Sequence, residues 1–478
     1  MLFNSISFAI FLPVVFILYW FAANRSIKWQ NILLLVSSYY FYSCWDYRFL
    51  FLLIFSTLLD YYTGIKMHEA TSEKKKKFWF WLSISVNLGF LGVFKYYNFF
   101  VESFANGLSQ FGIEEHYSTL QIILPVGISF YTFHGLSYVI DIYKGRIKPE
   151  RNFIDYAVFV SFFPLLVAGP IERATHLLPQ LQRKREFNSA KAIDGLRQIL
   201  WGLFKKLVIA DNCAEYANMV FSNSDGLSGS THIIGALFFT FQIYGDFSGY
   251  SDIALGTARL FGIDLLRNFA FPFFSRDTAE FWRRWHISLS SWFKDYLYIP
   301  LGGSKGGVWM KIRNTLIIFL VSGLWHGANW TYIIWGLLNA IYIIPSIVFN
   351  TNRHNMEIAA KGRLFATPRE IFHILTTFSL TAFAFIIFRA NTIADAVSYI
   401  AKIFSVSLFN KPEGIRNEVV WLLIVFIIIE WLGRENQYAL EKLGSRWPKL
   451  VRLSFYYLIL LIIFMYAGSS QQFIYFQF

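Results

Sequence analysis

Long apolar runs separated by short polar segments dominate the chain. Each run is expected to form a helix, because a helix satisfies its own backbone hydrogen bonds inside a lipid bilayer and about 20 apolar residues cross the hydrocarbon layer. The pattern predicts an all-helical membrane protein with about ten to twelve spans and no separate soluble domain. The runs cover residues 6–23, 32–44, 49–65, 78–94, 122–142, 153–170, 199–209, 233–260, 316–348, 371–388, 419–431 and 453–466.

Clusters of lysine and arginine set the predicted orientation of these spans. Four consecutive lysines at 74–77 follow the third run, and basic loops of this kind stay on the cytoplasmic side of a membrane. Counting spans from that loop places both termini on the extracytoplasmic side.

Two runs do not fit a simple alternation of loops between the two sides of the membrane. The run 153–170 is followed as well as preceded by basic residues and contains Pro164 and Gly169, which predicts a re-entrant segment. The run 199–209 contains Lys205 and Lys206 and is expected to lie partly at the membrane interface.

Composition supports the membrane assignment and narrows the chemistry. Of the 478 residues, 55% are hydrophobic and 15% are charged, whereas a soluble domain carries about 25% charged residues. The net charge of +13 resides in short loops between apolar runs, which indicates membrane orientation and not a nucleic-acid surface. Cys44 and Cys213 are too few for a disulfide framework or a cysteine metal site, and no zinc-type histidine spacing occurs. We therefore expect neither nucleic acid nor a metal.

His326 is an ionisable side chain inside the apolar run 316–348. Lipid cannot solvate a charge at that depth, so such a residue is a candidate functional residue. A neutral imidazole there can act as a general base toward a hydroxyl group, as acyl transfer requires. The alternative is a structural histidine that hydrogen-bonds a neighbouring helix. Asn329, in the same polar interruption, is a candidate for substrate binding.

A basic and aromatic region, residues 280–307, precedes that run. Arg283, Arg284 and Lys294 supply positive charge for an anionic donor such as a phosphorylated cofactor. Trp285 adds a flat stacking surface, and His286 lies beside it. The alternative is an ordinary basic cytoplasmic loop, which leaves the density of tryptophan and His286 unexplained.

A third polar motif, YGDFSGYSD at 244–252, interrupts another apolar run. Asp246, Tyr250 and Asp252 are candidates for substrate contact, and the two aspartates are also suited to support a channel, because carboxylates at that depth need partners or water. The alternative is a helix kink held by satisfied polar contacts.

Five motifs, taken in order, resemble those of the membrane-bound O-acyltransferase family, in its bacterial alginate O-acetyltransferase-like branch. They are LPVGISFY (124–131), FFPLLVAGP (162–170), DFSGYSD (246–252), FWRRWHISLS (281–290) and GLWHGAN (323–329). Two features depart from or fall outside that pattern. The region 350–411 matches no motif, and His134 stands where an uncharged polar residue such as glutamine is expected.

The resemblance implies one acyltransferase domain over 1–478, with a motif-bearing core at 120–348 and C-terminal helices with an aromatic tail at 370–478. Its fold is a ring of helices, with re-entrant and amphipathic segments, around a central channel. It implies that His326 is the catalytic histidine and that His286 is a second characteristic position. The donor is a thioester bound from the cytoplasm; acetyl-CoA is the expected donor substrate, with no tightly bound cofactor. The acceptor is an envelope polysaccharide beyond the bacterial inner membrane, usually served by a separate extracytoplasmic transferase of the SGNH type.

The last residues, QQFIYFQF at 471–478, resemble the terminal aromatic motif of this branch. A related D-alanylation system carries its acyl group on the C-terminal tyrosine of a small partner peptide. By analogy, we expect Tyr475 to fold back and accept the acyl group as an ester after His326 removes its proton. The alternative is an amphipathic tail that lies on the membrane surface.

Two other functions stay open at this point. One is D-alanyl transfer from a carrier protein to teichoic acid. The other is a non-catalytic transporter or scaffold of a polysaccharide secretion system, which calls for inverted repeats that are not visible in the sequence.

Overall fold

Helices form the regular structure of the described residues, and no strand occurs among them. The computed structural model describes residues 1–112, 119–120, 123–167, 169–223, 226–469, 471 and 473–474. Contacts divide the chain into two compact units, Met1–Asn188 with Leu260–Leu265, and Ser189–Arg259 with Leu266–Phe478. The all-helical class is thereby confirmed, whereas the single domain over 1–478 stays a prediction.

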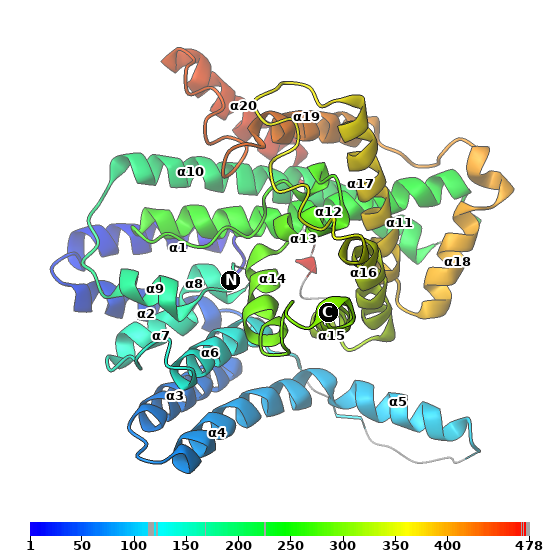
Figure 1. The fold of residues 1–478 in the computed structure, drawn as a ribbon. Helices are drawn as coiled ribbons and strands as arrows, with labels where there is room; N and C mark the ends of the chain where they lie inside the picture. Colours follow the sequence, from blue (N-terminus) through cyan, green and yellow to red (C-terminus); the bar gives the residue numbers. More distant parts are fainter. Residues whose placement is uncertain are drawn as a thin grey trace. The chain divides into compact units, whose positions relative to one another are not determined.

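The first unit contains helices α1 to α9 (Figure 1). Asp60 of α3 is buried and accepts hydrogen bonds from Ser83 and Asn87 of α4 at 2.5 and 2.8 Å. A carboxylate at membrane depth is costly unless it is paired in this way, so these side chains fix how α3 and α4 pack. The bounds are α1 (Ile6–Ile17), η1 (Leu18–Ala22), α2 (Ile27–Ser43), α3 (Tyr47–His68), α4 (Glu73–Leu91), η2 (Gly92–Tyr96), α5 (Tyr97–Ser109), α6 (Ile128–Tyr143), α7 (Phe153–Ser161), α8 (Phe163–Leu166) and α9 (Ala174–Leu181).

The segment predicted to be re-entrant is a broken helix. α7 ends at Ser161, Phe162 leaves the helical conformation with ψ near 116°, and α8 adds only one turn. The N–H of Phe163 donates to Ser38 Oγ at 3.0 Å, and the side chains around the break are buried. Non-helical backbone is tolerated at membrane depth where protein surrounds it. The local structure fits that condition, and the membrane topology of the segment stays a prediction.

His134 of α6 serves the packing of this unit. It is 1% exposed, and its Nε2 accepts a hydrogen bond from the backbone N–H of Glu172 at 3.1 Å. The imidazole therefore holds the chain that follows α8 against α6.

The second unit contains helices α10 to α20 (Figure 1). α10, η3 and α11 run on without a break, and η3 is a π-helical segment. The bounds are α10 (Ser189–Leu203), η3 (Phe204–Ala210), α11 (Asp211–Ser222), α12 (Gly229–Leu260), η4 (Pro272–Phe274), α13 (Thr278–Arg284), α14 (Ile287–Phe293), η5 (Lys294–Tyr298), α15 (Gly307–His326), α16 (Trp330–Val348), α17 (Pro368–Arg389), α18 (Ile393–Ile403), η6 (Val406–Phe409), α19 (Asn417–Gly433) and α20 (Lys449–Tyr466).

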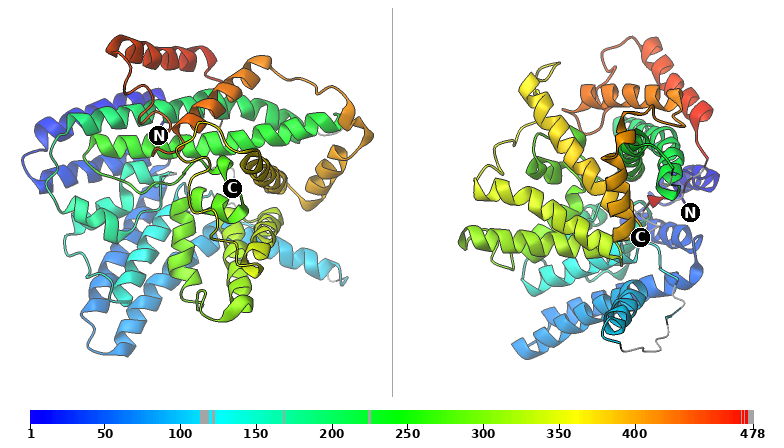
Figure 2. Two further views of the ribbon diagram at one scale, coloured as in Figure 1. Left: turned by 45° about the horizontal axis from the view of Figure 1, so that its top comes forward. Right: turned by 90° about the vertical axis from the view of Figure 1, so that its right-hand side faces the viewer.

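Glycines let helices of this unit approach one another closely. A Cβ added at Gly202 of α10 would lie 2.6 Å from the carbonyl oxygen of Gly249 in α12, and a Cβ at Gly249 would lie 2.8 Å from that of Gly202. In the hairpin of α15 and α16, a Cβ at Gly323 would lie 2.2 Å from the carbonyl oxygen of Tyr332. Helices that pack in membranes use small residues in this way. Figure 2 shows α15 and α16 side by side.

Six helices of the described residues are long and apolar enough to cross a membrane. α1 with η1 is apolar but shorter, and α12 is long but carries Asp246 and Asp252. The ring of ten to twelve spans around a channel therefore stays a prediction. The six are Tyr47–His68, Glu73–Ser109, Gly307–His326, Trp330–Val348, Pro368–Arg389 and Lys449–Tyr466.

Replacing Gly323 by valine is expected to destabilise the hairpin of α15 and α16. The new side chain meets backbone atoms that cannot rotate away, and overpacking of this kind costs about 1–3 kcal/mol. The apparent midpoint of thermal unfolding in detergent should fall. Gly89→Val is the matched control, because no atom lies within 4 Å of a Cβ at Gly89 in α4. Equal midpoints for the two variants would contradict the close contact.

Candidate functional site

His286 lies at the junction between α13 and α14, in a left-handed backbone conformation with φ 44° and ψ 52°. Such a conformation is uncommon for a residue with a side chain and persists when its surroundings enforce it. Here the N–H of Ile287 donates to Asn268 O at 2.9 Å, and the N–H of Ala270 donates to Arg284 O at 2.9 Å. The chain after α12 therefore holds the junction in place.

The side chain of Asn268 determines which nitrogen of His286 carries the proton. Asn268 Oδ1 accepts a hydrogen bond from the hydroxyl of Ser288 at 2.9 Å and lies 3.1 Å from His286 Nδ1. Asn268 Nδ2 faces the hydroxyl oxygen of Ser251 at 3.1 Å. Because the facing atom is an amide oxygen, Nδ1 of the neutral imidazole is the donor, and the lone pair resides on Nε2.

Aromatic rings enclose His286. The ring centroid of Phe247 lies 4.6 Å away, and that of Trp325 lies 5.8 Å away. The imidazole is 1% exposed and lies outside the six candidate spans. Burial lowers the pKa of His286 to about 3, because an apolar enclosure disfavours the charged form. His286 is therefore neutral near pH 7.

His326 is the last residue of α15, and its ring, like that of His286, lies beside the ring of Trp325. Its ring centroid is 4.8 Å from that of Trp325, 5.1 Å from that of Trp335 in α16 and 5.3 Å from that of Phe388 in α17. The side chain is 5% exposed. The two predicted histidines are thus brought to one aromatic cluster, with a single indole in contact with both imidazoles.

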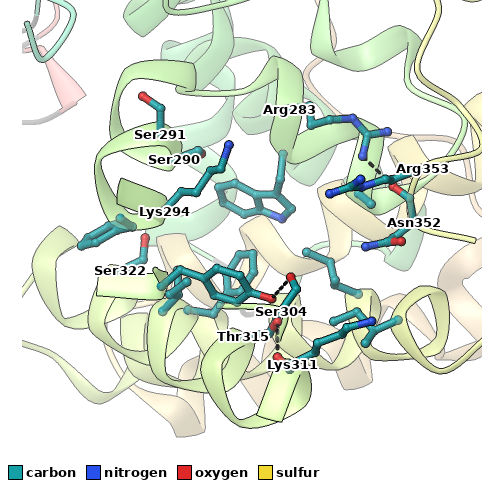
Figure 3. A pocket seen from close by; sticks show the side chains of 18 of the residues that line it. Arg283, Ser290, Ser291, Lys294, Ser304, Lys311, Thr315, Ser322, Asn352 and Arg353 are labelled. Atoms are coloured by element: carbon teal, nitrogen blue, oxygen red, sulfur yellow. Dashed lines mark hydrogen bonds between the residues drawn. The ribbon is translucent and has the colours of Figure 1, made fainter. Parts of the chain in front are cut away.

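A cavity of about 770 Å³ opens beside this cluster (Figure 3). Four basic residues, Arg283, Lys294, Lys311 and Arg353, are among its lining residues, together with the indole of Trp282. Of the α15 residues in the lining, Ser322 is the nearest in the chain to His326, which lies one helical turn further on. His326 itself is not among the lining residues, and four residues of α-helix correspond to an advance of about 6 Å.

Two of the predicted donor-binding residues line this cavity. Lys294 is exposed there. Arg283 also lines it, and its guanidinium donates to Asn352 O at 2.8 Å and to Asn355 O at 3.0 Å. Arg283 therefore both contributes charge and holds the chain that follows α16.

The other predicted donor-site residues lie in packing roles. Arg284 forms an ion pair with buried Glu280 at 2.7 Å. Trp285 is 3% exposed and stacks on Phe281 with centroids 5.5 Å apart. Asn329 is the N-cap of α16, where Oδ1 accepts from the N–H of Thr331 at 3.0 Å. None of these three is among the residues that line the cavity.

Both aspartates of the polar motif of α12 form ion pairs with lysines of η3, and the pair of Asp246 is fully buried. Asp246 lies 2.7 Å from Lys206 Nζ, and Asp252 lies 2.5 Å from Lys205 Nζ. Tyr250 is 1% exposed, and its ring lies 4.2 Å from that of Phe473 in the C-terminal segment. The aspartates thus tie α12 to η3, and their predicted roles in substrate contact and channel support stay predictions.

The C-terminal segment enters the core of this unit. Phe473 is 1% exposed and Ile474 is 0% exposed, and the N–H of Ile474 donates to Asp246 Oδ2 at 2.7 Å. An amphipathic tail on the membrane surface would leave these residues exposed, so their burial favours a tail that folds back. Tyr475 lies outside the described residues, and its predicted role stays a prediction.

Several residues of this site carried no strong signal in the sequence. Asn268 is a neutral amide with no motif around it, and Lys311 and Arg353 lie outside the five motifs. Lys206 was detectable, because a lysine inside an apolar run is rare without a partner. Among the described residues, no group of three or more His, Cys, Asp or Glu side chains is placed to hold a metal.

Comparison with known proteins gives the family. A model of MBOAT, the membrane-bound O-acyltransferase family, matches residues 149–381. The probable alginate O-acetylase AlgI of Azotobacter vinelandii is 37% identical over 454 residues, which cover 93% of this chain and 87% of that protein. The peptidoglycan O-acetyltransferase of Helicobacter pylori is 32% identical over 530 residues, which cover 100% of this chain and 98% of that protein. The chain belongs to the membrane-bound O-acyltransferase family.

Membership of this family makes the chain a multi-pass membrane enzyme that transfers acyl groups to oxygen, and it confirms the family resemblance of the five motifs. The teichoic acid D-alanyltransferase of Bacillus subtilis is more distant, at 28% identity over 293 residues, which cover 58% of this chain and 72% of that protein. Both His286 and His326 lie within the matched residues 149–381.

The low pKa of His286 predicts an acid-sensitive fold. The unfolded imidazole takes up a proton near pH 6.5, whereas the folded one stays neutral down to about pH 3. Between these values the unfolded state binds more protons, so stability is full above pH 6.5 and falls as the pH decreases. At pH 5 the loss is on the order of 2 kcal/mol.

Replacing His286 by glutamine should therefore reduce the drop in the unfolding midpoint between pH 7 and pH 5, measured in detergent. His373→Gln is the control, because His373 is exposed, and it should retain the drop of the unaltered chain. An identical drop in His286→Gln and the unaltered chain would contradict a buried neutral imidazole.

Proposed function

We propose that this enzyme takes an acetyl group from a cytoplasmic thioester and moves it across the bacterial inner membrane for O-acetylation of an extracellular or envelope polysaccharide. The observation that carries the proposal is the basic cavity whose lining includes Ser322, one helical turn before His326. Relatives similar over nearly the whole chain are named O-acetylase or O-acetyltransferase, which supports an acetyl group and a polymeric acceptor.

The chemistry of the cavity suits acetyl-CoA. Arg283, Lys294, Lys311 and Arg353 supply charge for the phosphates of such a donor, and Trp282 offers an aromatic face. Cationic side chains form charge-assisted hydrogen bonds with phosphate oxygens, and a cavity of this size is in the usual range of ligand sites, about 300–1,000 Å³. The thioester arm would extend past Ser322 toward His326. The donor binds as a substrate, and no tightly bound cofactor is required.

In the transfer step, His326 acts as the general base. Its imidazole removes the proton of an acceptor hydroxyl, and the hydroxyl oxygen attacks the thioester carbonyl carbon. The carbon–sulfur bond breaks, an oxygen ester forms, and the thiolate leaves and takes up a proton. A neutral base is needed at the start, and the aromatic enclosure of His326 supports that form. His286, whose ring also lies beside that of Trp325, would orient the reacting groups.

We further propose that Tyr475 supplies the first acceptor hydroxyl. Phe473 and Ile474 are buried beside α12, and Phe247 contacts both the ring of Phe473 at 6.3 Å and that of His286 at 4.6 Å. The described end of the tail, Phe473 and Ile474, therefore lies in the neighbourhood of His286. From the tyrosyl ester, the acetyl group would pass to an extracytoplasmic partner, such as an SGNH-type transferase, and then to the polysaccharide. Both termini are then extracytoplasmic.

D-alanyl transfer from a carrier protein is the second candidate. It is disfavoured because the D-alanyltransferase match covers 58% of the chain, against 93% and 100% for the O-acetyltransferases. The separate proposal of a non-catalytic scaffold requires that transfer survive without His326.

Purified protein incubated with radiolabelled acetyl-CoA should become labelled through a base-labile ester. His326→Ala should lower the labelling rate by about 10² or more, because general base catalysis contributes on that order. Tyr475→Phe should abolish the label, since it removes only the hydroxyl oxygen that receives the acetyl group. Tyr457→Phe is the matched control, because Tyr457 in α20 is exposed.

Each contrary result has a distinct meaning. Full labelling of Tyr475→Phe would remove the relay, and full activity of His326→Ala would remove His326 as the general base. If the protein became labelled from a D-alanyl carrier protein but not from acetyl-CoA, the donor would be the carrier protein and not acetyl-CoA.

Lys294→Gln should raise the KM for acetyl-CoA about tenfold with little change in kcat, because one charge-assisted hydrogen bond to the donor is lost. The effect should shrink at high salt, where exposed charges are screened. Lys361→Gln is the control, since Lys361 is exposed and lies outside the cavity lining. A fall in kcat at unchanged KM would contradict a donor phosphate contact.

A further inference from the structure

A buried charge cluster in the second unit takes no part in the transfer step described above. Lys206 of η3 lies 2.8 Å from Asp211 of α11 and 2.7 Å from Asp246 of α12. All three residues are at most 2% exposed. Two carboxyl groups share one ammonium group in this buried cluster, and such a cluster is costly unless further hydrogen bonds satisfy it.

The C-terminal segment supplies two of these further hydrogen bonds. The N–H of Ile474 donates to Asp246 Oδ2 at 2.7 Å, and Lys206 Nζ donates to Gln471 O at 3.3 Å. Both partners are backbone atoms of the tail, so the cluster fixes the path of the main chain and not one particular side chain.

The same stretch of η3 and α11 also holds the beginning of the tail. Asn212 Nδ2 donates to Tyr466 O at 2.8 Å, and the N–H of Gly468 donates to Leu207 O at 3.3 Å. The tail is therefore held at successive points from the end of α20 into the core, as can be followed from α20 in Figure 2. The ring of Phe473 then lies against Tyr250, with centroids 4.2 Å apart.

We propose that Lys206 and Asp246 are positioning residues that seat the C-terminal segment in the core and thereby set where Tyr475 begins. The second half of this statement rests on the relay proposed for Tyr475, whereas the seating itself does not. Release of the tail would leave a buried ammonium and a buried carboxylate each short of one hydrogen bond, in a place that water does not replace easily. The cluster thus favours the seated tail.

The neighbouring ion pair provides a matched control. Lys205 and Asp252 come from the same two elements, lie 2.5 Å apart and are 4% and 13% exposed. Their further contacts are with Gln198, which donates to Asp252 at 2.7 Å, and with the ring of Tyr244. No described residue of the tail is a hydrogen-bond partner of this pair. Asp252→Asn therefore removes the same charge from the same helix without touching the tail.

The seating is measured by the rate at which a bulky maleimide modifies a cysteine at position 474 of the full chain in detergent. The background is the variant that carries both Cys44→Ser and Ile474→Cys. Cys213 is kept in this variant because it is buried. Modification should be slow in this background, at least tenfold faster with Asp246→Asn, and within twofold of the background with Asp252→Asn. Lys206→Gln is the second variant, because it removes the contact with Gln471, and it should also accelerate labelling.

Labelling rates are compared only for variants that elute on size exclusion as the unaltered protein does. One such variant, Asp246→Asn or Lys206→Gln, is enough for the test. Unchanged labelling in such a variant overturns the seating. Equal acceleration by Asp252→Asn also overturns it, because the effect would then be general loosening. Full transfer by Tyr475→Phe, together with labelling that depends on Asp246, supports the seating and removes the relay alone.

Discussion

Close contact between α15 and α16 is the constraint on which the arrangement of the site depends. Gly323 and Gly336 each lie so near the opposite helix that a Cβ would come within 2.2 Å of a carbonyl oxygen. Gly327, after His326, is likewise covered by the ring of Tyr332. This contact brings Trp335 of α16 against His326, and α17 adds Phe388. Side chains from three helices, α15, α16 and α17, thus surround the imidazole of His326.

Ion pairs and a buried carboxyl group fix the packing of other helices in the second unit. The aspartates of α12 are paired with consecutive lysines of η3, and Glu430 of α19 accepts hydrogen bonds from Trp201 and Tyr244 at 2.9 and 2.6 Å. Replacement of buried ion pairs by apolar residues is often neutral or stabilising, so these pairs are weak evidence for stability. Their geometric effect is clearer, because they fix how α10, η3, α12 and α19 face one another.

The elements of this fold were largely predictable, whereas their contacts were not. The apolar runs predicted the helices because the length and hydrophobicity of a run can be read from a short stretch of sequence. The break near Pro164 was predictable for the same reason. His326 stood out because an ionisable group in apolar sequence is costly, and His286 stood out because of the tryptophans around it and the resemblance of its motif. Arg284, a predicted donor contact, forms an ion pair with Glu280 and lies outside the cavity lining. Its spacing of four from Glu280 fits an ion pair on one helix face, and that signal was present in the sequence.

What escaped prediction depended on residues far apart in the chain. Asn268 controls the proton of His286, yet a neutral amide carries no periodic or electrostatic signal. The number of spans was predicted from hydrophobicity alone, and helices such as α12 combine apolar length with buried carboxylates. The cavity collects Arg283, Lys311 and Arg353 from three separate segments, so no single motif contains it.

The π-helical segment η3 has a consequence for how this chain can vary. A π-helix holds one more residue per hydrogen-bonded turn than an α-helix and therefore rotates successive side chains by a smaller angle. Lys205 and Lys206 reach different aspartates of α12 through that wider winding. Loss of one residue between 204 and 210 would restore ordinary winding and swing a lysine away from its carboxylate. Homologous chains should therefore preserve the length of this segment even where its apolar side chains are exchanged.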